Sequence, residues 1–405
     1  MMLIKISWRN VWRNSLRSFV VIASIAIGIW AGVFVLGLST GLNNQRQQSA
    51  INNTLSHIQI HHPKFIKDFN VQYRIPNAGG LSDELEADSA VDVFTKRVIL
   101  TGMISSANGV YAVRISGVDL ETETQVTTLH TKLLEGEYLK GIKRNPVAIS
   151  QRMAKKLNVK LRNKVVLTFQ KDDGEIVAGA FRVAGIYKTI SSQADELNIY
   201  VQGSDVHRLL DLKDEYHEMA ILLNDFEQID VKTEYLKSQF PDLEIRPWNV
   251  VSPELGYANE MMSQLLYLFI AIILFALSFG IINTMLMAVL ERNKELAMLM
   301  SIGMNRPMVF LMIVIETVFI SMIGGPLGVL LGYFTINYYG NVGIDLSMVS
   351  EGLENFGVGS MVYTELETVF YINVTIMVLI SAMLSSIYPA WKALQVNPAE
   401  GVRGI

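Results

Sequence analysis

The sequence predicts an α-helical membrane protein with four transmembrane helices and a large α+β extracytoplasmic domain inserted between helices 1 and 2. Half of the 405 residues are hydrophobic and 18% are charged, whereas an average soluble domain is roughly 25% charged. The apolar residues gather in four uncharged or nearly uncharged runs, each long enough to cross a bilayer. Between the first two runs lies a polar stretch, 42–262, which is long enough to form its own core.

Composition excludes several classes of function. A net charge of −4, with no basic face beyond the first 17 residues, argues against nucleic-acid binding. No cysteine is present, which excludes disulfides, Cys-ligated zinc and a thiol nucleophile. No phosphate-binding loop, GxSxG or HExxH motif occurs, so we expect a chain that is not an enzyme and has no catalytic residue. His57, His61 and His62 are interpreted as surface histidines without a metal, because a strand would hold His57 and His61 about 13 Å apart.

Residues 1–17 predict an amphipathic helix at the membrane surface, although the start of a signal peptide is an alternative interpretation. Four basic residues recur every fourth position, next to an apolar group: Lys5, Arg9, Arg13 and Arg17. Transmembrane helix 1 is expected at 18–41. It carries Ser24, Gly28 and Gly32 four residues apart, a spacing that favours close packing on another helix, unless it only reflects the general abundance of glycine in membrane helices.

The region 42–262 is predicted to be α+β, because runs of alternating polarity indicate strands and several segments have helical patterns. A β-rich subdomain is expected at about 130–203. The flanking residues, 43–129 and 204–260, are expected to form a second subdomain that returns to the membrane.

Transmembrane helices 2, 3 and 4 are predicted at 263–290, 308–336 and 369–388. Helix 3 repeats the glycine spacing, at Gly324, Gly328 and Gly332. The loop 337–368 contains acidic residues and no Lys or Arg, whereas the N-terminus, the connector 291–307 and the tail 389–405 are basic next to the spans. The excess of positive charge on cytoplasmic segments therefore places both termini and the connector in the cytoplasm.

The connector 291–307 is predicted to be a short charged helix lying against another surface, although a solvated loop is the alternative. Gly303 fits its C-terminal end, and Asn305 with Pro307 would begin the next helix. Its charges crowd the opening turns, while an apolar face follows that should be buried in protein or lipid. The candidate contact residues are Glu291, Arg292, Lys294, Glu295, Leu296, Leu299, Met300 and Gly303.

Glu316 is a carboxylate inside predicted helix 3. A charge at this depth costs about 3 kcal/mol unless it is paired or lies near the interface. We interpret Glu316 as a hydrogen-bonding group in the bundle, with the N-terminal arginines as its possible partners. A role in proton relay is the alternative.

Four segments resemble the FtsX-like permease family of ABC transporters, which includes lipoprotein-releasing and MacB-type proteins. They are WRNVWRNSLRS at Trp8–Ser18, HIQIHHP at His57–Pro63 (after the post-span GLNNQ), ERNKELAMLMSIGMNR at Glu291–Arg306, and YPAWKALQVNPAEGVR at Tyr388–Arg403. The third is similar to the family's coupling helix, and the fourth to its C-terminal ending. The HIQIHHP segment favours the lipoprotein-releasing (LolC/LolE-like) branch.

The resemblance implies an inner-membrane permease with a MacB-like periplasmic core domain, which dimerises with a second permease subunit as a homo- or heterodimer. It implies that the coupling helix binds a cytoplasmic ABC ATPase dimer. ATP and Mg would then be bound through that partner, and no cofactor by this chain. It also implies mechanotransmission to the periplasmic domain, contact with membrane lipids, and transfer of an extracted lipoprotein to a periplasmic carrier. Two alternatives stay open: MacB-type export of peptides or drugs, and FtsX-like signalling to a cell-wall hydrolase.

Overall fold

The computed structural model describes residues 2–349, 352–353 and 358–395, so the last ten residues of the predicted tail 389–405 lie outside the described residues. The chain divides into two compact units. Unit 1 comprises Met1–Asn43, Glu260–Asp345 and Met361–Ile405, and unit 2 comprises Asn44–Asn259 and Leu346–Ser360.

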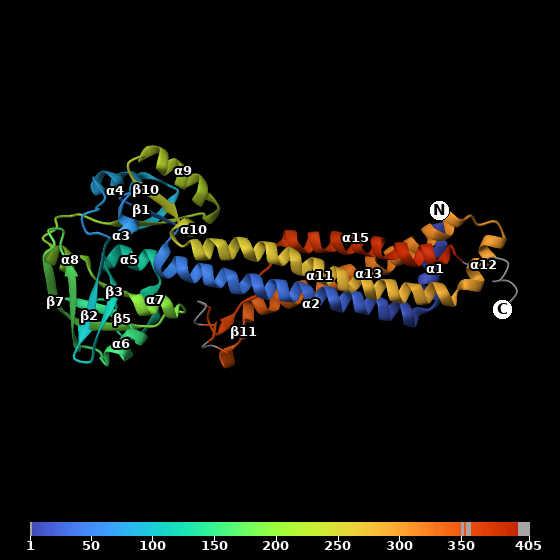
Figure 1. Cartoon of the computed structure of the whole chain (residues 1–405), viewed down its shortest axis with the longest axis horizontal. Helices are drawn as coiled ribbons and strands as arrows, with labels where there is room; N and C mark the ends of the chain where they lie inside the picture. Colours follow the sequence, from blue (N-terminus) through green and yellow to red (C-terminus); the bar gives the residue numbers. More distant parts are fainter. Residues whose placement is uncertain (1, 350–351, 354–357, 396–405) are drawn as a thin grey trace. The chain divides into compact units, whose positions relative to one another are not determined.

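Unit 1 is a bundle of long helices with a hydrophobic core (Figure 1). Within the described residues, four helical segments are long and apolar enough to span a membrane: Ser15–Leu55, Pro253–Glu291, Arg306–Val342 and Thr368–Ala393. The helices are α1 (Met2–Arg13), α2 (Ser15–Ala50), α11 (Pro253–Glu291), α12 (Asn293–Ser301), α13 (Arg306–Val342) and α15 (Thr368–Ala393). A short hairpin follows α13, made of β11 (Ile344–Asp345) and β12 (Met361–Val362).

The long helices extend beyond the predicted spans. The prediction ended helix 1 at residue 41, whereas α2 runs to Ala50 and continues as the π-helical segment η1 (Ile51–Leu55). Hydropathy identifies only the apolar part of a helix. The polar residues that follow Gly41 contain no proline or glycine until after Ser56, so nothing in this stretch ends the helix.

The predicted glycine stripes occupy close helix contacts, on two different faces of α2. On one face, a methyl group added to Gly328 of α13 would come within 2.6 Å of the carbonyl oxygen of Ala26, and Gly324 and Gly332 are similarly close to Ile22 and Val33. On the other face, Gly28 and Gly32 lie against Leu277 and Ile273 of α11. A side chain at these positions would therefore push the helices apart.

Ser24 does not follow this pattern. Its side chain is exposed, and its hydroxyl donates to the carbonyl oxygen of Val20 within α2. Ser24 also lines a cavity between α2 and α11, beside Ala276 and Gly280. The role of Ser24 in helix packing stays a prediction.

Unit 2 is built on one ten-stranded mixed sheet, whose strands run in the order β10-β1-β9-β2-β3-β8-β5-β7-β4, with β6 pairing both β2 and β7. The strands are β1 (Ile58–His61), β2 (Val91–Ser106), β3 (Gly109–Val118), β4 (Leu133–Gly136), β5 (Pro146–Ser150), β6 (Lys164–Gln170), β7 (Ile176–Tyr187), β8 (Asn198–Gln202), β9 (Glu218–Leu223) and β10 (Glu244–Pro247).

Short helices pack around this sheet (Figure 1). They are α3 (Phe65–Asp68), α4 (Ala78–Ala87), α5 (Leu120–Val126), η2 (Leu129–Lys132), α6 (Gln151–Leu157), α7 (Ser192–Leu197), α8 (Gly203–Leu210), η3 (Phe226–Gln228), α9 (Ile229–Gln239) and α10 (Trp248–Val251). The remaining turn, η4, covers Ser347–Val349.

The hydrophobic cores of unit 2 do not follow the predicted subdomain boundary. The larger core contains residues of β5–β8. It also contains Val98, Leu100 and Ile104 of β2 and Val113 and Ile115 of β3, and these five residues precede residue 130. The long strand β2 pairs with β9 through its first half and with β6 through its second half. Alternating polarity identifies a strand but not its distant partners, so the boundary at about 130–203 needs correction.

Candidate functional site

The predicted connector contains the nine-residue helix α12, which is shorter than the predicted 291–307. The chain leaves α11 at Glu291, turns at Arg292 and enters α12 at Asn293. After α12, Gly303 has φ +109°, which favours glycine. The side chain of Asn305 then accepts a hydrogen bond from the amide of Met308 at 3.0 Å. The positions predicted to end one helix and begin the next therefore do so.

The predicted apolar face of α12 is turned toward the rest of unit 1. Leu296 is 2% exposed in the bundle core, and Leu299 and Met300 pack against the same core. The exposed apolar side chains are Met298 and Ile302, at 57% and 79%. The prediction that Leu296 presents itself to a partner is therefore corrected, because the chain's own bundle already buries it. Met298 and Ile302, four residues apart, lie on the free side.

The charged residues at the start of the connector form ion pairs with the N-terminal helices. Arg13 donates to Glu295 at 2.6 Å, Arg17 pairs with Glu291, and Arg292 also contacts Glu295, at 3.2 Å. Partial burial by itself would raise the pKa of Glu295, but hydrogen bonds from Arg13 and Arg292 outweigh it, so the pKa is lowered. Glu295 therefore stays ionised and holds α1 to α12.

Glu316 is the buried member of this group, at 5% exposure in α13. Asn10 of α1 donates to it at 2.6 Å, and Arg292 contacts it at 3.1 Å. The expected partners were the N-terminal arginines, but the cation comes instead from the connector. Ser7 also donates to the carbonyl oxygen of Met312, at 3.2 Å. Hydrogen bonds from Ser7 and Asn10, together with the apolar packing of Val11, therefore hold α1 against α13.

These charges line a cavity of about 320 Å³ within unit 1. Its walls hold three cations and three carboxylates: Arg13, Arg17, Arg292, Glu291, Glu295 and Glu316. Because the formal charges cancel, the cavity offers no net charge to an ion. Sequence analysis missed this cluster, although one signal pointed to it: residues 1–17 carry cations and no acid, and the connector opens with two acids that need partners.

Lys294 and Gly303 complete the predicted contact residues. Both are exposed, and a methyl group added at Gly303 would meet no atom within 4 Å. They are therefore accessible to a partner on the free side of α12, together with Met298 and Ile302. The proposed role of all of these residues stays a prediction.

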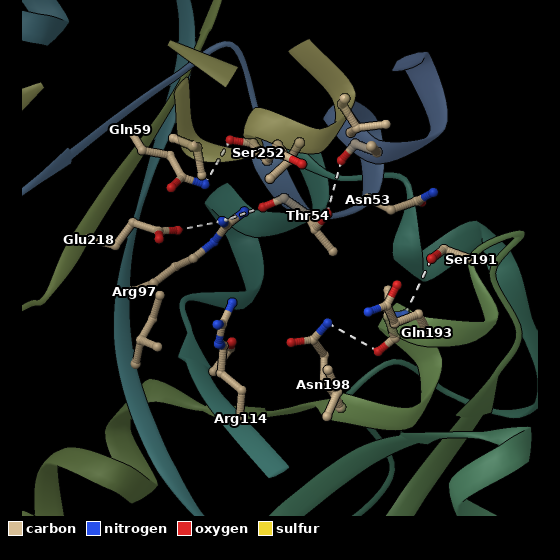
Figure 2. A pocket seen from close by; sticks show the side chains of 18 of the residues that line it. Asn53, Thr54, Gln59, Arg97, Arg114, Ser191, Gln193, Asn198, Glu218 and Ser252 are labelled. Atoms are coloured by element: carbon tan, nitrogen blue, oxygen red, sulfur yellow. Dashed lines mark hydrogen bonds and ion pairs between the residues drawn. The ribbon is translucent and has the colours of Figure 1, made fainter. Parts of the chain in front are cut away.

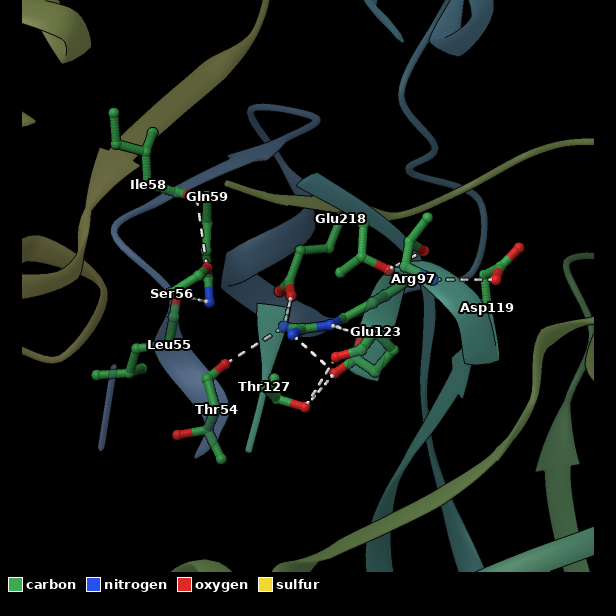
Figure 3. A network of polar contacts seen from close by, with 12 residues as sticks. Thr54, Leu55, Ser56, Ile58, Gln59, Arg97, Asp119, Glu123, Thr127 and Glu218 are labelled. Carbon is green, nitrogen blue, oxygen red and sulfur yellow. Dashed lines mark hydrogen bonds and ion pairs between the residues drawn. The ribbon is translucent and has the colours of Figure 1, made fainter. Parts of the chain in front are cut away.

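Unit 2 contains a second charged group, and it is buried (Figure 3). Arg97 of β2 donates two hydrogen bonds to Glu123 of α5, both at 2.9 Å, and one to Glu218 of β9 at 2.7 Å. His61 of β1 lies 2.9 Å from the other oxygen of Glu218. Burial would raise the pKa of Glu218, but the bonds from His61 and Arg97 lower it to about 2.

His61 therefore corrects a prediction. It is 2% exposed rather than on the surface. His61 belongs to β1, which lies between β9 and β10, and all four residues of this strand are buried. Among the described residues, no group of three or more His, Asp or Glu side chains is arranged to hold a metal ion.

Next to this group lies a cavity of about 400 Å³, whose lining residues all belong to unit 2 (Figure 2). It is bounded by the end of α2 with η1, by β1–β3, by α7 with β8, and by the segment 251–255 at the start of α11. The walls mix amide, hydroxyl, guanidinium and apolar side chains. No feature of the sequence indicated this cavity, because its walls come from residues as distant in sequence as Arg46 and Leu255.

Comparison with known proteins places both units in one family. A family model described as MacB-like periplasmic core domain matches residues 18–238, more than half of the chain. A second, described as FtsX-like permease C-terminal, matches 267–398. The chain belongs to the FtsX-like permease family of ABC transporters. This confirms the resemblance, and it makes the chain a membrane permease with a MacB-like periplasmic domain.

The FtsX-like permease has curated relatives along nearly its whole length. The lipoprotein-releasing system transmembrane protein LolC of Haemophilus influenzae is 24% identical, over 94% of this chain and 91% of its own. The LolE protein of the same organism is 19% identical, over 98% and 97% of the two chains. The macrolide export ATP-binding/permease protein MacB of Campylobacter jejuni is 34% identical, but over only 23% of this chain and 14% of its own.

Proposed function

We propose that this FtsX-like permease is the transmembrane subunit of an ABC transporter that extracts lipoproteins from the inner membrane. A separate cytoplasmic ATPase dimer would supply ATP hydrolysis. The permease, paired with a second permease subunit, would convert that hydrolysis into a conformational change of its periplasmic domain and pass the lipoprotein to a periplasmic carrier.

The observation that carries this proposal is the extent of the alignment with lipoprotein-releasing proteins. LolC and LolE of Haemophilus influenzae align over more than 90% of both chains. Such an alignment includes the membrane helices, the connector and the large domain together. The match to MacB, by contrast, covers 93 residues.

The connector supports the partnership with an ATPase. The helix α12 lies between two spans, holds exposed Met298 and Ile302 on its free side, and is ion-paired to α1 and α13 on the other. The excess of Lys and Arg beside the spans favours a cytoplasmic position for it and for both termini. A partner that displaces the connector would act on α13 through the buried pair of Arg292 with Glu316, whereas the exposed pair of Arg13 with Glu295 can break and re-form.

Transmission requires two arrangements of the helix bundle that the ATPase and the periplasmic ligand bind with different affinity. Gly324, Gly328 and Gly332 have no side chains at their contacts with α2. The helix α13 can therefore shift along α2 with little disturbance of side-chain packing. These glycine contacts all lie within unit 1.

The test is reconstitution of the permease and its ATPase in liposomes that contain a triacylated lipoprotein. We expect ATP-dependent release of the lipoprotein to a soluble acceptor. A Walker-motif variant of the ATPase, which binds but does not hydrolyse ATP, is the matched control. Absence of release, with ATPase activity stimulated by a cell-wall hydrolase, would instead support signalling without transport.

Export of peptides or drugs is the second candidate, and the match to the MacB-like periplasmic core domain favours it. The same liposomes distinguish it from lipoprotein release. ATP-dependent movement of a macrolide, without release of the lipoprotein, would replace the first proposal with this one.

The docking surface has its own test. Met298→Asp and Ile302→Asp each place a charge on the free side of α12, and we expect either to abolish co-purification of the ATPase. Val231→Asp in α9, where the valine is 75% exposed, is the control for an added surface charge. If the complex survives both connector variants, α12 is not the docking helix.

A further inference from the structure

We propose that the cavity of unit 2 binds a small amphipathic anion, with Arg114 as the residue that holds its charged group. The proposal goes beyond lipoprotein extraction, because it concerns a soluble ligand of the periplasmic domain. The cavity volume of about 400 Å³ lies within the range typical of small-molecule sites.

The first observation is a cation without an ionic partner. Arg114 rises from β3 into the cavity, near Arg97 (Figure 2). Its guanidinium lies 4.5 Å from the centre of the Phe69 ring, a cation–π contact. Among the described residues, no carboxylate pairs with Arg114 or with Arg46, which lines the same cavity from α2. Arg97, by contrast, is fully engaged by Glu123 and Glu218.

The unpaired guanidinium groups on the walls mark where an anion would bind. The cations are Arg46, Arg97 and Arg114, and the carboxylates are Glu218 and Glu254. Arg97 is held by Glu218 and by Glu123, so the arginines on the walls without a carboxylate partner among the described residues are Arg46 and Arg114. A guanidinium in a concave site binds carboxylate or phosphate through two parallel hydrogen bonds.

A second, independent observation is a buried polar atom without a partner. His61 is 2% exposed and lines the cavity, and its Nδ1 has no hydrogen-bond partner among the described residues, although its Nε2 contacts Glu218. Leaving such a buried atom unpaired is destabilising. When Nε2–H donates to Glu218, Nδ1 is an acceptor, so a hydroxyl of a bound ligand, such as the P–OH of a singly ionised phosphate monoester, would satisfy it.

The remaining walls suit an uncharged, partly apolar body. Asn198 and Gln193 extend from the wall across from Arg97 (Figure 2). Apolar surface is contributed by Leu55, Phe69, Leu197 and Leu255. The ligand class is therefore a carboxylate or phosphate monoester with a short apolar chain. Such a ligand would contact η1, the sheet and the start of α11 at once, and so hold these three parts of unit 2 together.

Three probes of equal chain length test the proposal: hexanoate, hexyl phosphate and hexanol. Calorimetric titration would use the full-length permease in lipid nanodiscs at constant ionic strength, with empty nanodiscs as the blank. We expect at least one of the two anions to bind at least tenfold more tightly than hexanol, and the tighter of the two identifies the charged group. No ATPase is present, so the result is independent of lipoprotein transport.

Arg114→Gln should weaken binding of the favoured anion at least tenfold and leave hexanol unchanged. Arg144→Gln is the matched control, because Arg144 is an exposed arginine of the same unit that does not line the cavity. Asn198→Ala, in the wall that faces Arg97, tests the site without a change of charge and should weaken binding as well. Equal affinity of hexanol and both anions, or wild-type affinity in Arg114→Gln, would overturn the proposal.

Discussion

The two units each contain a cluster of arginines and glutamates, but they bury them to different degrees. In unit 2 the side chains of Arg97, Glu123 and Glu218 are 5%, 0% and 6% exposed. In unit 1 the pair of Arg13 with Glu295 is 52% and 47% exposed. A buried charge that loses its partner is strongly destabilising, whereas a half-exposed pair contributes little and exchanges readily with water.

This difference separates structural charges from movable ones. The cluster of unit 2 joins β1, β2, β9 and α5, so it fixes how the sheet and its helix assemble. The cluster of unit 1 joins α1, α12 and α13 at the place where we propose that an ATPase acts. Weak, solvated ion pairs suit a contact that must break and re-form, and only the pair of Arg292 with Glu316 is anchored below the surface.

The largest effect is expected for Arg97→Met, which leaves Glu123 and Glu218 buried without a cation. The free energy of unfolding of unit 2 should fall by about 3 to 5 kcal/mol. Urea denaturation in detergent, with hydrogen exchange at β2 and β9, measures it. Arg246→Met is the control, since Arg246 forms a half-exposed pair with Glu244 and should cost less than about 1 kcal/mol. An equal loss of unfolding free energy in the two variants would contradict the proposed difference between buried and exposed pairs.

The next effect concerns pH and His217, which lies beside the cluster of unit 2. Its ring stacks on Phe65 at 5.0 Å, and its Nε2 bonds the carbonyl oxygen of Val71. Burial lowers the pKa of His217 to about 4 from the ordinary 6.5. Stability from the neutral ring is therefore complete above pH 6.5 and is lost as pH falls from 6.5 toward 4.

Between pH 6.5 and 4.5 the free energy of unfolding should drop by about 2 to 3 kcal/mol through this residue. His217→Gln should flatten the curve over that window. Glu218, with its pKa of about 2, contributes at lower pH, below the ordinary glutamate value of 4.5. A curve unchanged by His217→Gln would show that another group titrates there.

Local features of this chain were predictable, and distant pairings were not. Gly303 and Asn305 bound the connector as expected, because a positive φ and a helix cap depend on neighbouring residues. The partner of Glu316 was misjudged, since Asn10 lies 306 positions away in sequence and Arg292 was expected to face a partner protein. Hydrophobic periodicity likewise showed the apolar face of α12 but not what covers it.

The same limit applies to unit 2. The alternation in HIQIH identified a strand, yet whether His61 meets solvent depends on β9 and β10, which lie more than 150 residues later. The cavity around Arg114 depends on still more segments. A sequence pattern reports the period of an element, whereas its neighbours are set by the packing of the whole sheet.

A smaller effect is expected at Glu316. Glu316→Ala removes the acceptor of Asn10 and leaves Arg292 free to turn toward solvent, so α1 should loosen by about 1 to 3 kcal/mol. Hydrogen exchange of residues 2–13 measures this. Glu316→Gln keeps an oxygen for Asn10 and should have a smaller effect. If α1 exchanges equally in the wild type and both variants, Ser7 and the apolar contacts alone hold it.

The smallest effect is expected for the exposed pair of Arg13 with Glu295. A double-mutant cycle with Arg13→Ala and Glu295→Ala should give a coupling free energy of about 0.2 to 1 kcal/mol. The coupling should decline as salt rises, because solvent screens exposed charges. The swapped variant, Arg13→Glu with Glu295→Arg, should regain only part of it, because Arg292 also contacts Glu295. A coupling above about 2 kcal/mol would place this pair with the buried cluster of unit 2 and remove the reason for regarding the contact of α1 with α12 as movable.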